Sequence, residues 1–121
     1  MSDDKRWELG IATFKKVYGN VIPAPPKEAG DFGTICIEQQ FAEVWSRDVM
    51  TMRDRRLALL GALIALGEEG PFRIHAESAL ANREITPKEL NEVVIFLTPY
   101  VGYPRATKVL SIVAQLARQY S

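Results

Sequence analysis

The chain has 121 residues, of which 47% are hydrophobic and 25% charged, a size and composition that predict a single domain over residues 1–121 with its own core. Fifteen basic side chains balance fifteen acidic ones, which argues against a surface built to hold nucleic-acid phosphates. The most apolar run, residues 57–66, is about half as long as the roughly 20 residues that cross a bilayer, so we do not interpret it as a membrane span.

The start of the chain and its cysteine content favour a reducing compartment. The first seven residues contain no apolar signal segment, and the single cysteine, Cys36, cannot form a disulfide within the chain. Cys36 lies between isoleucines, where we interpret it as a buried, unreactive thiol and not as a nucleophile. We therefore expect a cytoplasmic protein.

The first half of the chain predicts two helices joined by an extended connector. Residues 4–18 carry an apolar stripe with spacings of four, three and four, formed by Trp7, Ile11, Phe14 and Tyr18. Three prolines between residues 21 and 30 predict extended backbone. Asp31 is then expected to cap a long helix that ends near residue 47.

The central helix is predicted to begin at Thr51, with Asp54 three residues further on in a capping-box pattern, and to end near Gly67. Its middle, residues 57–66, is uncharged and apolar on every side, which indicates burial all round, in a core or between subunits. Small residues four apart would let another helix approach closely. We therefore expect a tightly packed helical assembly.

Three further helices are predicted in the rest of the chain. Pro71 suits the first turn of a helix that runs to residue 82. Thr86, followed by Pro87 and Glu89, is a capping box that opens the next helix, which Pro99 should kink or stop. A break at residues 102–104 precedes a final helix to about residue 119. The fold class is therefore all-α, with about six helices.

Few residues could carry chemistry. Glycine-rich phosphate loops, paired cysteines and histidine clusters with metal spacing are missing from the sequence, which removes nucleotides and structural zinc as strong candidates. His75, the only histidine, is the natural general acid or base, although a lone histidine on an apolar line can also be a hydrogen-bonded core residue. Glu43 lies in a mostly apolar turn and is either a carboxylate with a raised pKa or a solvated helix residue.

Several arginines could bind a substrate carboxylate with two parallel hydrogen bonds. The candidates are Arg47, Arg53, Arg55 and Arg105. Each of them could equally be a charged residue at a helix end.

Five segments stand out together. They are residues 41–47 (FAEVWSR), 52–55 (MRDR), 73–75 with 79–82 (RIH and ALAN), 85–90 (ITPKEL) and 100–104 (YVGYP). In order and spacing they resemble the carboxymuconolactone decarboxylase family, and the resemblance covers about residues 32–116. It implies an all-helical fold shared with alkylhydroperoxidase D, assembled as a homo-oligomer, either a trimer or a hexamer.

The redox branch of this superfamily carries a Cys-x-x-Cys-x-x-x-His motif. With its histidine placed on His75, the cysteines would fall on Glu68 and Pro71, neither of which can attack or resolve a disulfide. We therefore exclude that peroxidase mechanism. The resemblance then implies the decarboxylase branch, which removes carbon dioxide from a small carboxylated unsaturated lactone without a cofactor.

The implied reaction suggests a role for each candidate. An arginine, Arg47 or Arg53, would stabilise the negative charge that spreads onto the lactone carbonyl. His75 would protonate a carbon, and Glu43 would hold the imidazole in one orientation. Apolar walls would exclude water, with Phe41, Trp45, Phe96 and Tyr100 as candidates. The substrate would be a small-molecule carboxylate.

The sequence also departs from the family's pattern. Phe96 occupies the place of a second histidine, Arg83 follows Asn82 where the family usually has glycine, and Pro99 beside Tyr100 is unusual. These departures leave open a non-catalytic oligomeric scaffold or small-molecule-binding protein as the alternative function.

Overall fold

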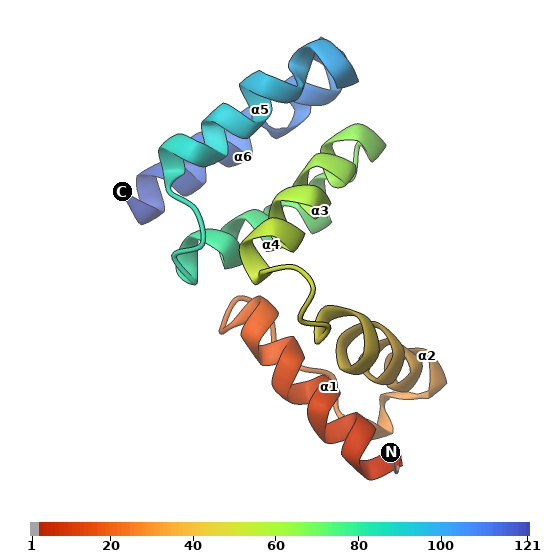
Figure 1. Cartoon of the computed structure of the whole chain (residues 1–121). Helices are drawn as coiled ribbons and strands as arrows, with labels where there is room; N and C mark the ends of the chain where they lie inside the picture. The colour runs from red at the N-terminus through yellow and green to blue at the C-terminus, as the bar shows by residue number, and fades with distance from the viewer. Residues whose placement is uncertain (1–2) are drawn as a thin grey trace. The chain divides into compact units, whose positions relative to one another are not determined.

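The computed structural model describes residues 3–121, in which every regular element is helical and no strand occurs. The predicted all-α class with about six helices is confirmed. The chain divides into two compact units, Met1–Met50 and Thr51–Ser121, which we describe one at a time (Figure 1). The expected single domain remains a prediction. None of the helices in the described part of the chain is long and apolar enough to span a membrane.

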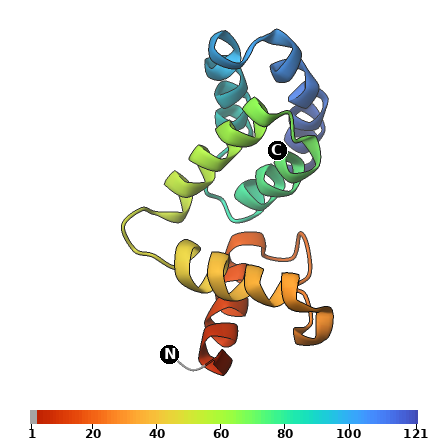
Figure 2. The same cartoon turned by 90° about the vertical axis from the view of Figure 1, so that its right-hand side faces the viewer.

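The first unit contains α1 (Asp3–Tyr18), η1 (Lys27–Ala29), α2 (Asp31–Ile35) and η2 (Cys36–Trp45). η2 packs across α1 (Figure 2). Their contact is aromatic: the Phe41 ring of η2 lies 5.0 Å from that of Phe14 and 5.8 Å from that of Tyr18, both on α1. The apolar stripe predicted on the first helix therefore does form the contact face at its C-terminal half.

The long helix predicted from Asp31 is present, but its geometry differs from the expectation. Gly30 and not Asp31 occupies the N-cap position, and Asp31 is the first helical residue. From Cys36 to Trp45 the backbone winds as a π-helix. This winding is wider than that of the α-helix that the sequence predicts over these residues.

Gly10 permits the close approach of α1 to η2. A Cβ atom built on Gly10 would collide with the backbone carbonyl of Ile37, which is itself completely buried. A backbone neighbour cannot move aside as a flexible side chain can. The absence of a side chain at this position therefore sets the distance between the two helices.

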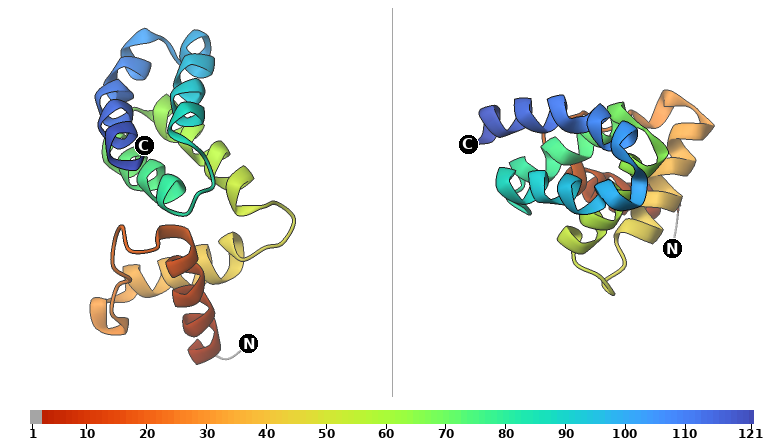
Figure 3. Two further views of the ribbon diagram at one scale, coloured as in Figure 1. Left: turned by 90° about the vertical axis from the view of Figure 1, so that its left-hand side faces the viewer. Right: turned by 90° about the horizontal axis from the view of Figure 1, so that it is seen from above.

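The second unit contains α3 (Met52–Leu66), α4 (Glu69–Ala81), α5 (Pro87–Val101) and α6 (Tyr103–Tyr120). α5 and α6 lie side by side, and α4 packs against both α3 and α6 (Figure 3). The most completely buried core side chains come from all four helices and include Leu60, Ile64, Phe72, Leu90 and Leu116.

The expectation that residues 57–66 are buried on every side does not hold within the second unit. Leu60, Leu63 and Ile64 are buried, but Leu66 is 68% exposed and the alanines of this run face solvent. α3 thus has one face in the core of the second unit and one apolar face that the other helices of this unit leave uncovered. Burial of that second face between subunits remains a prediction.

Local signals set most helix ends where the sequence predicts them. The Thr51 side chain accepts a hydrogen bond from the Asp54 N–H, and Thr86 and Glu89 form a complete capping box. Gly67 ends α3 with a φ of 72°. Pro99, in contrast, does not stop α5, which continues to Val101.

The C-terminal end of α4 depends on a residue with an unusual backbone conformation. The Arg83 N–H donates to the Leu80 carbonyl and the Glu84 N–H to the Ala79 carbonyl, which together form a Schellman end. Arg83 has a φ of 58° and is the one non-glycine residue with positive φ among residues 3–121. The left-handed turn is therefore kept in spite of the missing glycine, and the Arg83 backbone is strained.

Gly10→Ala should lower the free energy of unfolding by about 1–3 kcal/mol, because α1 and η2 must separate to accommodate the methyl group. Gly70→Ala is the matched control, since a Cβ atom on this helical glycine meets nothing within 4 Å. The control should be neutral or stabilising by up to about 1 kcal/mol. Denaturant unfolding of the three proteins measures both effects, and equal stability of Gly10→Ala and the parent would contradict the tight contact.

Arg83→Gly should raise the free energy of unfolding by roughly 0.5–1 kcal/mol, since glycine adopts the left-handed conformation without a steric penalty. Arg83→Ala keeps that penalty and should give no such gain. Thermal unfolding of the two variants tests the strain, and the same midpoint for both would argue against it.

Candidate functional site

A completely buried arginine organises the polar interior of the second unit. Arg56, on α3, is 0% exposed, and its Nε and Nη2 donate to the two carboxylate oxygens of Glu84 over 2.9 and 3.1 Å. Its Nη1 lies 2.9 Å from Nδ1 of His75 on α4. One guanidinium therefore binds a carboxylate with two hydrogen bonds and reaches an imidazole with its remaining nitrogen.

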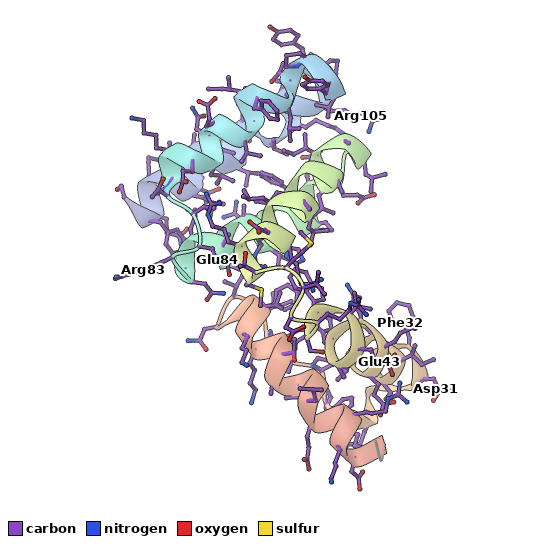
Figure 4. All side chains as sticks on the ribbon, in the orientation of Figure 1. Asp31, Phe32, Glu43, Arg83, Glu84 and Arg105 are labelled. Carbon is purple, nitrogen blue, oxygen red and sulfur yellow. The ribbon has the colours of Figure 1, made fainter. Side chains whose placement is uncertain are left out.

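The turn after α4 presents Glu84 to Arg56. Arg83 points away from the unit at the end of α4, whereas Glu84 lies towards α3 (Figure 4). Asn82 Nδ2 also donates to the Glu84 carboxylate over 3.2 Å. Arg53 donates to the Glu84 backbone carbonyl over 3.0 Å and to the Glu89 carboxylate over 2.8 Å. The strained left-handed turn thus places the carboxylate that neutralises the buried arginine.

His75 is held as a neutral imidazole. Its side chain is only 7% exposed, and burial, followed by the Arg56 charge, lowers its pKa to about 4. An arginine nitrogen can only donate a hydrogen bond, so the Nδ1 that faces it must accept, and the proton of the neutral ring lies on Nε2. A pKa near neutral pH, which the sequence suggested for a general acid or base, is therefore not what this environment produces.

Three of the residues predicted for the site lie in the first unit, whereas His75 is in the second. Glu43 forms an ion pair with Arg6 at 2.5 Å, and both side chains are partly exposed. The Trp45 ring stacks on Phe41 at 6.4 Å, and Arg47 follows in the turn after η2. The stacking is internal to η2, whereas the Glu43–Arg6 ion pair connects η2 to α1. The described partner of His75 Nδ1 is Arg56 and not Glu43.

The other two predicted binding residues, Phe96 and Tyr100, lie on α5. Their rings are 5.8 Å apart and largely exposed. Phe96 also borders an open cavity of about 420 Å³ between α3 and α5, whose lining is almost entirely apolar; its other lining residues are Leu57, Ala58, Gly61, Val93 and Leu97. This surface can accept an apolar group or another helix, but it supplies no charged side chain of its own.

Cys36 is partly exposed and not fully buried as expected. Its thiol contacts the Gln40 side chain at 3.5 Å, and partial burial raises its pKa above the usual value. A raised pKa keeps the sulfur in the thiol form, which agrees with the interpretation of Cys36 as unreactive. Among the residues that the structure describes, no group of three or more potential ligands could hold a metal ion.

Arg56 and Glu84 are not among the site residues that the sequence predicts. A signal for Arg56 was available, because it precedes the buried Leu60 and Ile64 by four and eight residues and so lies on the same face of α3. No comparable signal marks Glu84, whose position depends on the turn after α4.

Acidification should destabilise the protein through His75. The unfolded chain, with a histidine pKa near 6.5, binds a proton that the folded chain, with a pKa of about 4, does not bind between these values. The contribution of His75 to the free energy of unfolding is therefore fully present above pH 6.5, and it decreases as the pH drops towards 4.

Between pH 7 and pH 5, the free energy of unfolding of the parent should fall by about 2 kcal/mol more than that of His75→Gln, which has no imidazole to titrate. Denaturant unfolding at a series of pH values measures the difference. Parallel pH profiles for the two proteins would show that His75 titrates normally.

Comparison with known proteins places the chain in a family. The model of the carboxymuconolactone decarboxylase family matches residues 31–115. A curated relative, 4-carboxymuconolactone decarboxylase from Acinetobacter baylyi, is 26% identical, and the similarity covers 96% of this chain and 90% of the relative. The matched segment begins at α2 and includes Arg56, His75 and Glu84. The chain belongs to the carboxymuconolactone decarboxylase family.

Proposed function

We propose that the protein is a cofactor-free carbon-carbon lyase that decarboxylates a small carboxylated lactone or a related enolisable acid. The observation that carries this proposal is the match of the family model to residues 31–115, supported by the similarity to the Acinetobacter baylyi enzyme over nearly the whole chain. The absence of a usable thiol pair near His75 in the sequence supports the lyase chemistry over thiol-dependent peroxide reduction.

The reaction needs a place for the electrons of the broken bond. When the carbon-carbon bond to the carboxylate breaks, carbon dioxide leaves and the electron pair enters the conjugated system, where an oxygen takes up negative charge. A proton then adds to carbon and gives the neutral product. Hydrogen-bond donors aimed at that oxygen lower the barrier because their interaction strengthens in the transition state.

The proposed site consists of the residues singled out from the sequence. His75 and Glu43 are the proposed catalytic residues, and the proposed substrate-binding residues are Arg47, Arg53, Trp45, Phe96 and Tyr100. Arg53 is the best supported of the binding residues, because its side chain is 45% exposed and lies close to the buried polar cluster. It donates to the backbone carbonyl of Glu84, whose carboxylate binds Arg56. An exposed guanidinium at this position can exchange Glu89 for a substrate carboxylate.

The proposed assembly is a cytoplasmic trimer or hexamer. Support comes from the uncovered apolar face of α3 and from the exposed rings of Phe96, Tyr100 and Tyr103, since exposed apolar side chains are often buried at subunit interfaces.

A non-catalytic small-molecule-binding protein is the second candidate. The 7% exposure of His75 and the phenylalanine at position 96 favour it, because both limit proton transfer to a ligand. The two candidates differ in product formation: a binder would retain a carboxylated lactone unchanged, whereas a lyase would release carbon dioxide.

Incubation of the purified protein with carboxylated muconolactones and related acids should release carbon dioxide. His75→Gln should lower kcat/KM by about 10²-fold or more with the helical content unchanged. Arg73→Gln, a change on the same helix in a side chain that contacts Gln115, serves as the control and should retain activity. Ligand binding without carbon dioxide release would favour the binder, and normal turnover of His75→Gln would remove His75 from the mechanism.

A further inference from the structure

We propose that Arg56 is a positioning residue that fixes His75 in one tautomer, with the proton on Nε2, so that His75 acts as a neutral hydrogen-bond donor to the oxygen that gains charge. The catalytic half of this inference rests on the proposed function. The tautomer itself follows from the geometry of the second unit alone.

The direction of the Arg56–His75 hydrogen bond decides the tautomer. All five N–H groups of a guanidinium donate, and the group remains protonated at any working pH. With Arg56 Nη1 2.9 Å from His75 Nδ1, the imidazole nitrogen must offer its lone pair. A doubly protonated ring would place two N–H donors and two positive charges against each other in a buried site. His75 therefore carries its single ring proton on Nε2.

Glu84 keeps Arg56 in the orientation that this contact requires. Two hydrogen bonds, at 2.9 and 3.1 Å, bind the guanidinium plane to the carboxylate, and the Arg56 and Glu84 side chains are 0% and 9% exposed. Asn82 and Arg53 hold Glu84 in turn, through its carboxylate and its backbone carbonyl. Glu84 thus binds the Nε and Nη2 nitrogens of Arg56, and the third nitrogen, Nη1, faces the imidazole.

The arrangement reverses the common one, in which a carboxylate accepts the Nδ1 proton of a histidine and favours a proton acceptor at Nε2. Here a cation donates to Nδ1, and Nε2 is the donor. A neutral donor of this kind stabilises charge on an enolate-type oxygen without having to lose its own proton. The proton that completes the reaction at carbon then comes from water or from another group, and His75 returns to the same state without titrating.

The single histidine makes the tautomer directly measurable. In the ¹⁵N-labelled full-length protein, two-bond ¹H–¹⁵N correlation spectra distinguish a protonated ring nitrogen from an unprotonated one. At pH 7, Nδ1 should show the shift of an unprotonated nitrogen and Nε2 that of a protonated one, with no averaging. A proton on Nδ1, or averaged shifts that indicate exchange between tautomers, would overturn the inference.

Two variants test whether Arg56 is the cause. Arg56→Met removes the donor, and the double variant Arg56→Met with Glu84→Gln also removes the carboxylate that would be left buried and unpaired. In either variant that folds, the Nδ1 and Nε2 shifts should average and the pKa of His75 should rise. Arg73→Gln removes a charge from the same helix and should leave the tautomer unchanged. An unchanged single tautomer in the folded double variant would show that another contact sets it.

A kinetic measurement separates positioning from a merely structural role. If substrate turnover is established, folded Arg56→Met should lose at least about 10-fold in kcat with a smaller change in KM, since the misdirected donor matters most in the transition state. The activity of the parent should show no protonation step of His75 between pH 6 and 7. Failure of turnover would reject the proposed function and leave the spectroscopic test intact, whereas a wrong tautomer in an active enzyme would reject this inference alone.

Discussion

The ion pair between Arg56 and Glu84 is the interaction on which the second unit depends. A guanidinium that is 0% exposed is costly unless its charge is balanced and its donors are bonded, and Glu84 and His75 do this from α4 and the turn that follows it. α3 and the end of α4 must therefore keep one relative position. The same constraint accounts for the strained Arg83, because the left-handed residue brings the Glu84 carboxylate to the arginine.

Much of the fold could be predicted because its signals are local. The capping box at Thr86, the left-handed glycine at position 67 and the breaks around residues 102–104 act through neighbouring backbone groups, and the structure has helix ends there. Family membership could be predicted for a similar reason, since five short segments in register retain their identity without any knowledge of packing.

The polar interior could not be predicted in the same way. Helical periodicity places Arg56 on the buried face of α3, but arginine side chains are usually exposed because they are charged. Only the contact with Glu84, which the sequence does not reveal, explains why Arg56 is buried. The pKa of His75 likewise depends on burial by distant residues and on a cation from another helix. The π-helical winding of η2 and the uncovered face of α3 also arise from packing, which a repeating pattern does not encode.

A fixed neutral imidazole suits decarboxylation better than a titrating one. Breaking the carbon-carbon bond creates negative charge on oxygen, so the most useful group is one whose hydrogen-bond donor already points at that oxygen and does not lose its proton to solvent. A histidine with a pKa near neutral pH would divide its population between two charge states and two tautomers. Arg56 leaves His75 with one charge state and one tautomer. The buried charge of Arg56 then requires a counter-ion, which Glu84 supplies. In the proposed reaction, the donor on α4 would thus be preorganised by the fixed charge of Arg56 on α3.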